Sequence, residues 1–388
     1  MAKRPARQPS LKAPKVVDVP LPDDAPPPPP APISLASVLG QRRACATLRA
    51  AMGSQRLHHA WLFHGPRGVG KFTAALAFAA VLLDPTSEPD LAGELAPDPE
   101  SPTQRLLRAG THPDLHVVTK ELARYHPDPE VRKLKLSRIP VDVVRHFLIE
   151  PATRGPRAPV HGRASKVFIV DDAELLDPKA GQNALLKTLE EPEGSTVIIL
   201  VTPSPDRLIP TIRSRCQQVG FSPLTPRDMN AWLETLPPDE LPERSPWLID
   251  FADGSPGALL HAARAGMQEW HDAIAPGLRR ALKGEYPAGL AGVMVGFIDA
   301  AVKAAQAEEG DSIGKEAPTR EAAARMFRVI AHALRAALRE RPGEADHPAL
   351  DAIDALDRAE RMVMGNTAFP FVAEWFVARL VSREPARF

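Results

Sequence analysis

The sequence is poor in cysteine, in net charge and in long apolar runs, and each shortage excludes a class of protein. Its two cysteines, Cys45 and Cys216, are too few and too far apart for a disulfide framework or a four-cysteine zinc module. The 48 basic and 48 acidic side chains cancel, so no global positive field is available to hold nucleic acid. No run approaches the roughly 20 apolar residues of a membrane span, and the polar N-terminus lacks the apolar core of a signal peptide. We therefore expect a soluble, cytoplasmic protein with no membrane contact, whose DNA contacts are local or shared with partner subunits.

A glycine-rich stretch at residues 65–71, Gly-Pro-Arg-Gly-Val-Gly-Lys, is the most informative feature that is present. The pattern Gly-x-x-x-x-Gly-Lys lets backbone N–H groups surround phosphate oxygens while the lysine reaches the outer phosphates. Residues 60–63 read as a short buried strand, and the apolar residues after the glycines predict a helix, which is the context that this motif needs. The sequence therefore predicts a phosphate-binding loop made by Gly65, Gly68, Gly70 and Lys71.

The position after the lysine departs from this motif. A serine or threonine there normally gives its oxygen to a magnesium ion, but this chain has Phe72, which cannot bind a metal. Thr73 lies one residue later and is turned by about 100° on a helix. The sequence thus has the architecture of a nucleotide-hydrolysing domain without one part of its chemistry, and it leaves open whether ATP and magnesium bind weakly or not at all.

A second nucleotide motif is the run Val-Phe-Ile-Val-Asp-Asp at residues 167–172. An aspartate at the end of a buried strand, here Asp171, can help hold magnesium. Proteins that hydrolyse nucleotide usually have a glutamate next, to position the attacking water. Asp172 is one methylene shorter, and a misplacement of about 1 Å can cost on the order of 100-fold in rate. The alternative interpretation of both aspartates is a solvated strand end.

Strands and helices alternate through the first part of the chain, which predicts an α/β fold with a parallel sheet covered on both faces. After Phe221 the strands stop, and Thr225 to Asp228 form a capping box that opens an all-α remainder. Asp253 to Gly257 interrupt that remainder, and a polar stretch divides its last part before the helix resumes at Arg320. The further strands are predicted at residues 115–118, 166–170, 196–201 and 218–221.

We expect four parts along the chain: a disordered proline-rich tail (1–33), a phosphate-loop base domain (34–222), a small helical lid (223–264) and a C-terminal helical domain (265–388). The tail cannot build a core, because it is polar and contains five consecutive prolines. Within the base domain, residues 84–102 read as an acidic surface loop, and residues 139–148 predict an amphipathic helix.

The run Asn183 to Pro192, Asn-Ala-Leu-Leu-Lys-Thr-Leu-Glu-Glu-Pro, followed by Ser214-Arg215-Cys216, resembles the bacterial clamp-loader subunits of the AAA+ class. His112 to Leu115 and Leu57 to Ala60 are similar too, and the resemblance covers roughly residues 33–262. It implies a subunit of the DNA polymerase III holoenzyme, a hetero-oligomer that opens the ring-shaped sliding clamp and places it on primed DNA during replication. The implied partners are the gamma or tau subunits, the delta subunit, the clamp and, through the complex, primed DNA. The C-terminal helices would then be the collar that joins the loader.

Within that family, Ser214, Arg215 and Cys216 correspond to the arginine-finger motif that one subunit presents to its neighbour's nucleotide. The resemblance therefore implies that Arg215 acts in trans at a partner's γ-phosphate. A guanidinium suits this role because it brings planar, permanent charge to the negative charge of phosphoryl transfer. The alternative is a surface arginine at a strand start. Cys216 fits a small buried hydrophobe better than a nucleophile, because no paired histidine is evident.

Two further departures from the family pattern indicate which type of subunit the chain resembles. The four zinc-binding cysteines that motor-type subunits usually carry are missing from residues 83–112, so we expect no metal site. Gly257 stands where the lid usually supplies a sensing arginine. Together with Phe72 and Asp172, these changes resemble the delta-prime type, a member that serves a neighbour's active site and is not expected to be an ATPase by itself. The rival interpretation is an active ATPase of the gamma or tau type, with Thr73 or water replacing the missing ligand.

Overall fold

The computed structural model describes residues 26–54, 56–89, 95–134, 136–237, 245–309, 315–340 and 347–382. The chain divides into two compact units, residues 1–232 and 233–388, and each is described by itself. Residues 1–25 of the predicted tail lie outside the described residues. Residues 26–33 have no regular secondary structure, and Pro28 lies against Gly110. The predicted boundaries at 222 and 264 stay predictions.

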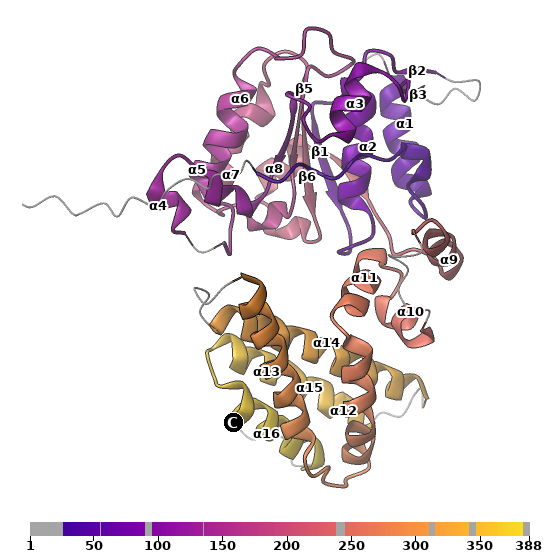
Figure 1. Ribbon diagram of the computed structural model, residues 1–388, viewed down its shortest axis with the longest axis vertical. Coiled ribbons are helices and arrows are strands. Elements are labelled where there is room, and N and C mark those ends of the chain that lie inside the picture. The colour runs from indigo at the N-terminus through magenta and orange to yellow at the C-terminus, as the bar shows by residue number, and fades with distance from the viewer. Residues whose placement is uncertain are drawn as a thin grey trace, which may run out of the picture. The chain divides into compact units, whose positions relative to one another are not determined.

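A five-stranded parallel sheet forms the centre of the first unit, in the order β4-β5-β6-β1-β7 (Figure 1). Every neighbouring pair is parallel, and β1 lies between β6 and β7. The predicted strands are confirmed, with β7 one residue earlier than expected. Their bounds are β1 (Ala60–His64), β4 (Leu115–Val118), β5 (Lys166–Val170), β6 (Thr196–Thr202) and β7 (Gln217–Gly220).

Helices cover both faces of this sheet, because alternate side chains of the interior strand β1 are apolar on both sides. Trp61 and Phe63 are fully buried, and their rings contact Phe78 with centroids 5.2 and 6.4 Å apart. Ala60 and Leu62 point the other way into a second apolar cluster. In Figure 1, α1, α2 and α3 lie on one side and α5, α6 and α7 on the other. The bounds are α1 (Arg42–Gly53), α2 (Lys71–Leu83), α3 (Pro102–Arg108), α4 (Pro129–Arg132), α5 (Val141–Val144), α6 (Glu150–Ala152), α7 (Ala180–Glu190) and α8 (Pro210–Arg215), with short helical turns η1 (Leu35–Ser37), η2 (Lys120–Tyr125), η3 (Arg145–Ile149), η4 (Ala173–Leu175) and η5 (Pro205–Arg207).

The helix predicted at residues 139–148 is present but differs in two ways. It begins at Val141, because Pro140 is its N-cap and Ile139 instead forms a parallel bridge with Leu176. The turn η3 between α5 and α6 is a π-helix, which inserts one extra residue per turn. Apolar periodicity shows neither feature, since both depend on backbone pairing.

Of residues 84–102, the described residues 84–89 and 95–102 lie mostly at the surface, as the predicted surface loop requires, but they also contain two short strands that were not predicted. β2 (Glu88–Pro89) pairs with β3 (Leu95–Ala96) in a small antiparallel sheet. Asp84 is buried and accepts hydrogen bonds from Thr86, Ser101 and Gln104. This carboxylate therefore ties the end of α2 to the start of α3.

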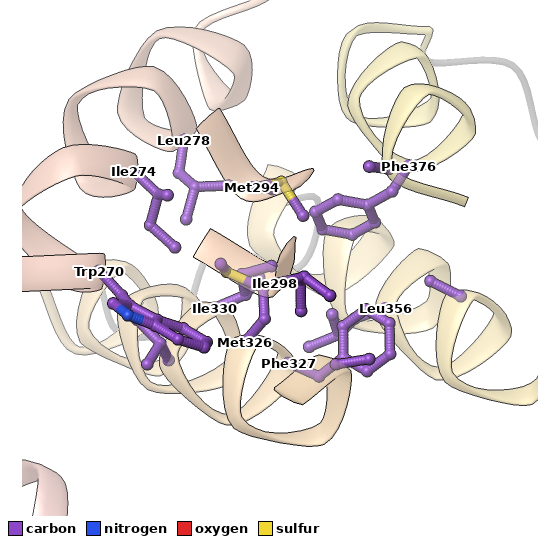
Figure 2. Close-up of a cluster of buried hydrophobic side chains, with 14 of the residues drawn as sticks. Trp270, Ile274, Leu278, Met294, Ile298, Met326, Phe327, Ile330, Leu356 and Phe376 are labelled. Atoms are coloured by element: carbon purple, nitrogen blue, oxygen red, sulfur yellow. The ribbon is translucent and has the colours of Figure 1, made fainter. Parts of the chain in front are cut away.

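The second unit contains no strand among its described residues. Helices α12, α13, α14, α15 and α16 contribute side chains to one apolar core (Figure 2). The predicted capping box is confirmed at α9, where Thr225 Oγ1 accepts from the Asp228 N–H. The predicted break is confirmed between α10 and α11, and α14 begins four residues before the predicted Arg320. The bounds are α9 (Pro226–Glu234), which crosses the division, α10 (Pro246–Ala252), α11 (Pro256–Arg264), α12 (Met267–Leu282), α13 (Leu290–Glu309), α14 (Glu316–Glu340), α15 (Pro348–Met364) and α16 (Phe369–Val381).

Helix α13 qualifies the expectation that no apolar run approaches the length of a membrane span. Its 18-residue stretch Leu290–Ala307 has a mean hydropathy of 1.4. By length and composition alone, it is long and apolar enough to cross a membrane. Met294 and Ile298 of this stretch are buried in the core shown in Figure 2. A single helix of this kind is weak evidence for a span, because core helices pass the same test.

We predict that Asp84→Asn destabilises the first unit by about 2–4 kcal/mol at pH 7, because the amide leaves buried donors without an acceptor. Burial raises the pKa of Asp84, but hydrogen bonds from Ser101, Thr86 and Gln104 outweigh it and hold the pKa below its usual 3.8. The carboxylate therefore stabilises the fold above about pH 4 and loses this effect as pH falls through its folded pKa. Chemical denaturation of the wild type and the variant at pH 7 and at low pH measures both effects.

Asp98→Asn is the matched control, since Asp98 is exposed and its side chain accepts only from the Glu100 N–H among the hydrogen bonds described. An equal loss of stability in both variants at pH 7 would contradict the role of the buried carboxylate.

Candidate functional site

The predicted glycine loop joins β1 to α2 at the carboxyl end of the sheet. Gly65 has a φ of +136°, and a Cβ there would lie 2.2 Å from the Phe221 carbonyl oxygen, so a side chain does not fit. Gly68 and Gly70 also have positive φ values, of 73° and 95°. Gly70 is the N-cap of α2. The structure therefore gives residues 65–71 the strand, loop and helix context that the motif requires.

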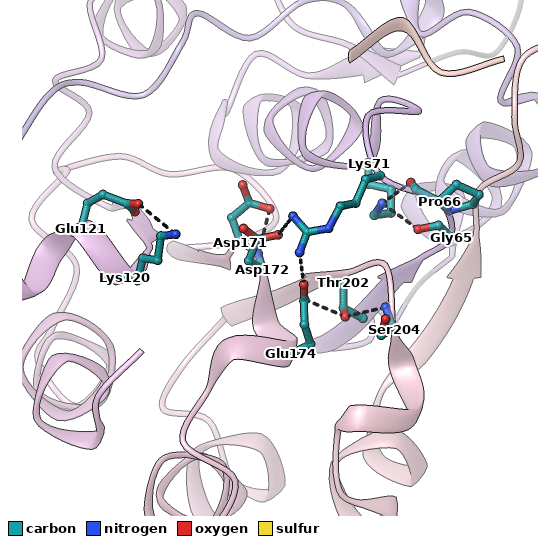
Figure 3. Close-up of polar contacts among 11 residues, drawn as sticks. Gly65, Pro66, Lys71, Lys120, Glu121, Asp171, Asp172, Glu174, Thr202 and Ser204 are labelled. Atoms are coloured by element: carbon teal, nitrogen blue, oxygen red, sulfur yellow. Dashed lines mark hydrogen bonds and ion pairs between the residues drawn. The ribbon is translucent and has the colours of Figure 1, made fainter. Parts of the chain in front are cut away.

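Lys71, the first residue of α2, folds back onto the loop (Figure 3). Its Nζ donates to the Gly65 carbonyl at 2.8 Å and to the Pro66 carbonyl at 2.5 Å. Burial lowers the pKa of Lys71 to about 8, against the opposing attraction of Asp171. The amine is thus mostly protonated at neutral pH and already holds two acceptors of its own chain.

Asp171 and Asp172 follow β5 at the same edge of the sheet, so the structure brings them to the loop as predicted. Burial and the charge of Asp172 raise the pKa of Asp171 to about 6, although its bond from the Asp172 N–H and the charge of Lys71 oppose this. Asp172 has a left-handed backbone, with φ of 48°. Its carboxylate is 3.2 Å from Arg67 NH1 of the loop.

Three residues of this site were not predicted from the sequence: Arg67, Glu174 and Thr202. Arg67 NH2 lies 2.6 Å from Glu174 Oε1, and Thr202 Oγ1 donates to Glu174 Oε2 at 2.9 Å (Figure 3). The Glu174 side chain is only 2% exposed. These contacts connect the loop, the segment after β5 and the end of β6. The sequence feature that could have indicated Glu174 is its position as a single acid within the apolar run 173–176.

The residues present fit a magnesium–nucleotide complex only in part. Asp171 offers a carboxylate beside the loop, but the position for the hydroxyl ligand holds Phe72, and Thr73 is exposed on α2. We expected Gly257 to stand in place of a sensing arginine. It lies in the first turn of α11 and provides no side-chain donor. The donor set is therefore incomplete.

Arg215, the last residue of α8, lies at the opposite end of the sheet. Its NH1 donates to the Thr211 carbonyl at 3.0 Å, and its NH2 forms an ion pair with Glu190, the last residue of α7. Gln217, two residues later, pairs with Trp61 near the start of β1, whereas the glycine loop follows the end of that strand. At about 3.3 Å per residue, β1 alone separates the two ends by roughly 13 Å.

The neighbours of Arg215 have ordinary structural contacts. Ser214 Oγ donates to the Thr211 carbonyl. Cys216 packs in the apolar cluster of Ala60 and Leu62, and burial raises the pKa of its thiol to about 12. The thiol stays protonated at neutral pH, which fits a buried hydrophobe.

Residues 40–225, just under half of the chain, match the family model described as "DNA polymerase III, delta subunit". This segment of the chain is similar to the DNA polymerase III delta-subunit family. The parallel sheet with the glycine loop, and the helices described in the second unit, confirm the predicted fold class of an α/β phosphate-loop domain followed by helices.

Two of the proteins that this chain resembles have different names. The DNA polymerase III subunit delta' of Pseudomonas aeruginosa is 35% identical over 240 residues, covering 61% of this chain and 65% of that protein. The subunit gamma/tau of Mycobacterium bovis is 34% identical over 212 residues, covering 53% and 31%. The match therefore spans less than two thirds of either relative. Among solved structures, a gamma subunit-related protein from Thermotoga maritima aligns over 87% of this chain and 98% of its own, with 15% identity and a TM-score of 0.44.

We predict that Asp171→Asn raises the melting temperature of the first unit by a few degrees at pH 7.5. The folded pKa of Asp171, about 6, lies above its unfolded value of 3.8, so the ionised carboxylate weakens the fold above about pH 6. This cost fades as pH falls from 6 to 4, and the advantage of the variant should fade with it. Thermal unfolding across this pH range is the measurement.

Asp177→Asn is the contrasting control. The pKa of Asp177 is lowered, chiefly by the hydrogen bond that its carboxylate accepts from the Ala180 N–H at the start of α7. This variant should be less stable than the wild type at pH 7.5. An Asp171→Asn protein that is also less stable there would contradict the assignment of a buried, disfavoured charge.

Proposed function

We propose that this chain is a delta-prime-type subunit of the clamp loader of DNA polymerase III. In this function it supports the opening of the sliding clamp and its placement on primed DNA. It contributes Arg215 to ATP bound by an adjacent gamma or tau subunit, and it hydrolyses no ATP by itself. The cell compartment of this function is the cytoplasm.

The position of Arg215 carries this proposal. Arg215 lies near the amino end of β1, and Lys71 follows its carboxyl end. Because one sheet connects the two positions, the guanidinium cannot approach the phosphate site of its own chain without unfolding the strand between them. An arginine in this place can therefore serve only the nucleotide of another molecule.

The chemistry of phosphoryl transfer suits such an arrangement. Negative charge spreads over the transferred group in the transition state, and a guanidinium brought by a neighbour stabilises it. Arginine fingers are worth roughly 10³- to 10⁵-fold in rate. Arg215 is 35% exposed, so part of its guanidinium is accessible to a partner.

The contacts of the glycine loop support a subunit that does not hydrolyse ATP. Lys71 is engaged with two carbonyls, and Arg67 holds Asp172 and Glu174. Asp172 would have to leave this ion pair to position a water molecule. The hydroxyl ligand is replaced by Phe72.

The names of the relatives support the choice of partners. The relatives include delta' and gamma/tau subunits of DNA polymerase III. We therefore assign gamma or tau and delta as the neighbours of this chain, with the clamp and primed DNA reached through the complex. The helices of the second unit would form its share of the collar.

We predict that Arg215→Ala slows ATP hydrolysis at the adjacent site by about 10³-fold or more, because the charge on the transferred phosphate loses its partner. The measurement is single-turnover hydrolysis in a reconstituted complex in which only the gamma or tau subunit next to this chain can hydrolyse ATP.

Arg213→Ala is the matched control on the same helix. Arg213 has similar exposure and, like Arg215, pairs with an acid of its own chain, here Asp206. It should leave the rate within a few-fold of the wild type. Unchanged hydrolysis in an intact Arg215→Ala complex would refute the trans role.

A second candidate function is an autonomous ATPase of the gamma or tau type, which the gamma/tau relatives and the proximity of Lys71 and Asp171 favour. We predict no magnesium-dependent turnover by the purified chain above that of its Lys71→Ala variant, because the hydroxyl ligand is missing. A phosphate-release assay measures this. Robust turnover that Lys71→Ala abolishes would establish the second function in place of the first.

A further inference from the structure

The ion pair between Arg215 and Glu190 joins the ends of two helices. Glu190 is the last residue of α7, and Arg215 is the last residue of α8. We propose that Glu190 is a positioning residue, which holds the guanidinium of Arg215 in the orientation that a neighbour's phosphate requires. This inference rests on the proposed function of Arg215.

The two contacts of Arg215 restrict a side chain that otherwise has many conformations. Glu190 binds NH2, and the Thr211 carbonyl binds NH1. A guanidinium has five N–H donors in a fixed plane, so these two contacts leave three for a phosphate. An arginine that is oriented before its partner arrives loses less freedom on binding, which is the basis of preorganised catalysis.

Both anchors stand on backbone that is itself fixed. The Leu189 carbonyl, next to Glu190, is 2.8 Å from His59 Nε2 at the start of β1. Gln182 of α7 is buried, donates to the Arg207 carbonyl, and accepts from the Ile209 N–H just before α8. Polar contacts that do not involve Arg215 therefore hold the end of α7 and the start of α8, where Thr211 lies.

The Glu190 ion pair could either orient Arg215 or keep it away from a neighbour's phosphate. The sizes of the two interactions decide between these roles. The Arg215 and Glu190 side chains are 35% and 46% exposed, and an ion pair of this exposure changes an equilibrium by about fivefold at most. A finger contact changes the rate by about 10³- to 10⁵-fold. Glu190 is thus too weak to keep Arg215 from a triphosphate, but strong enough to select its orientation.

The test uses the reconstituted complex in which only the adjacent gamma or tau site hydrolyses ATP. Glu190→Ala should lower the kcat at that site by about 2- to 5-fold and leave the KM for ATP unchanged, because the neighbour binds the nucleotide. The kcat should fall less in Glu190→Gln, because glutamine retains one acceptor oxygen. In an Arg215→Ala background, Glu190→Ala should have no further effect.

Glu191→Gln is the matched control, because Glu191 is exposed next to Glu190 and has no ion pair in the described part of the chain. Size-exclusion chromatography confirms that each complex assembles. An unchanged or higher kcat in Glu190→Ala, or the same decrease without Arg215, would overturn the positioning role alone. A silent Arg215→Ala variant would instead overturn the proposed function on which this role depends.

Discussion

The direction of the parallel sheet is the constraint on which the rest of this chain depends. All carboxyl ends of the strands meet at one edge, so the glycine loop after β1 and the aspartates after β5 are adjacent. All amino ends meet at the other edge, and the segment from α8 to β7 brings Arg215 there. A folded sheet therefore keeps the phosphate loop and this arginine apart in any one molecule, whatever the side chains around them.

At the loop edge of the sheet, the cations interact with acids of the same chain. Two cations, Arg67 and Lys71, face the carboxylates of Asp171, Asp172 and Glu174. A triphosphate would add further negative charge to a place that already holds three acids, and Phe72 occupies the position of the hydroxyl that usually binds the metal ion. The same contacts tie the loop to the ends of β5 and β6 without any ligand. Rigidity at this edge thus follows from interactions within the chain.

Much of the fold could be predicted from the sequence because it depends on local patterns. Apolar runs gave the five strands, and glycine spacing gave the loop. The missed residues depend on contacts between distant segments. Glu174 is 107 residues from Arg67, and the acid network of Asp84 closes only when α3 folds against α2. Neither periodicity nor motif spacing contains that information. The pairing of Glu190 with Arg215 was hidden for the same reason, although both residues stand in recognised motifs.

The two edges of the sheet differ in what their cations still have to offer. Lys71 is 6% exposed and its amine is bound by two carbonyls, so a ligand would have to displace contacts that already satisfy it. Arg215 is partly exposed and uses two of its five donors. A new anion at Arg215 adds hydrogen bonds without removing buried ones. Because binding favours the place where desolvation costs least and unused donors remain, these contacts support the proposal that the chain acts on a phosphate held by a neighbour and not on one in its own loop.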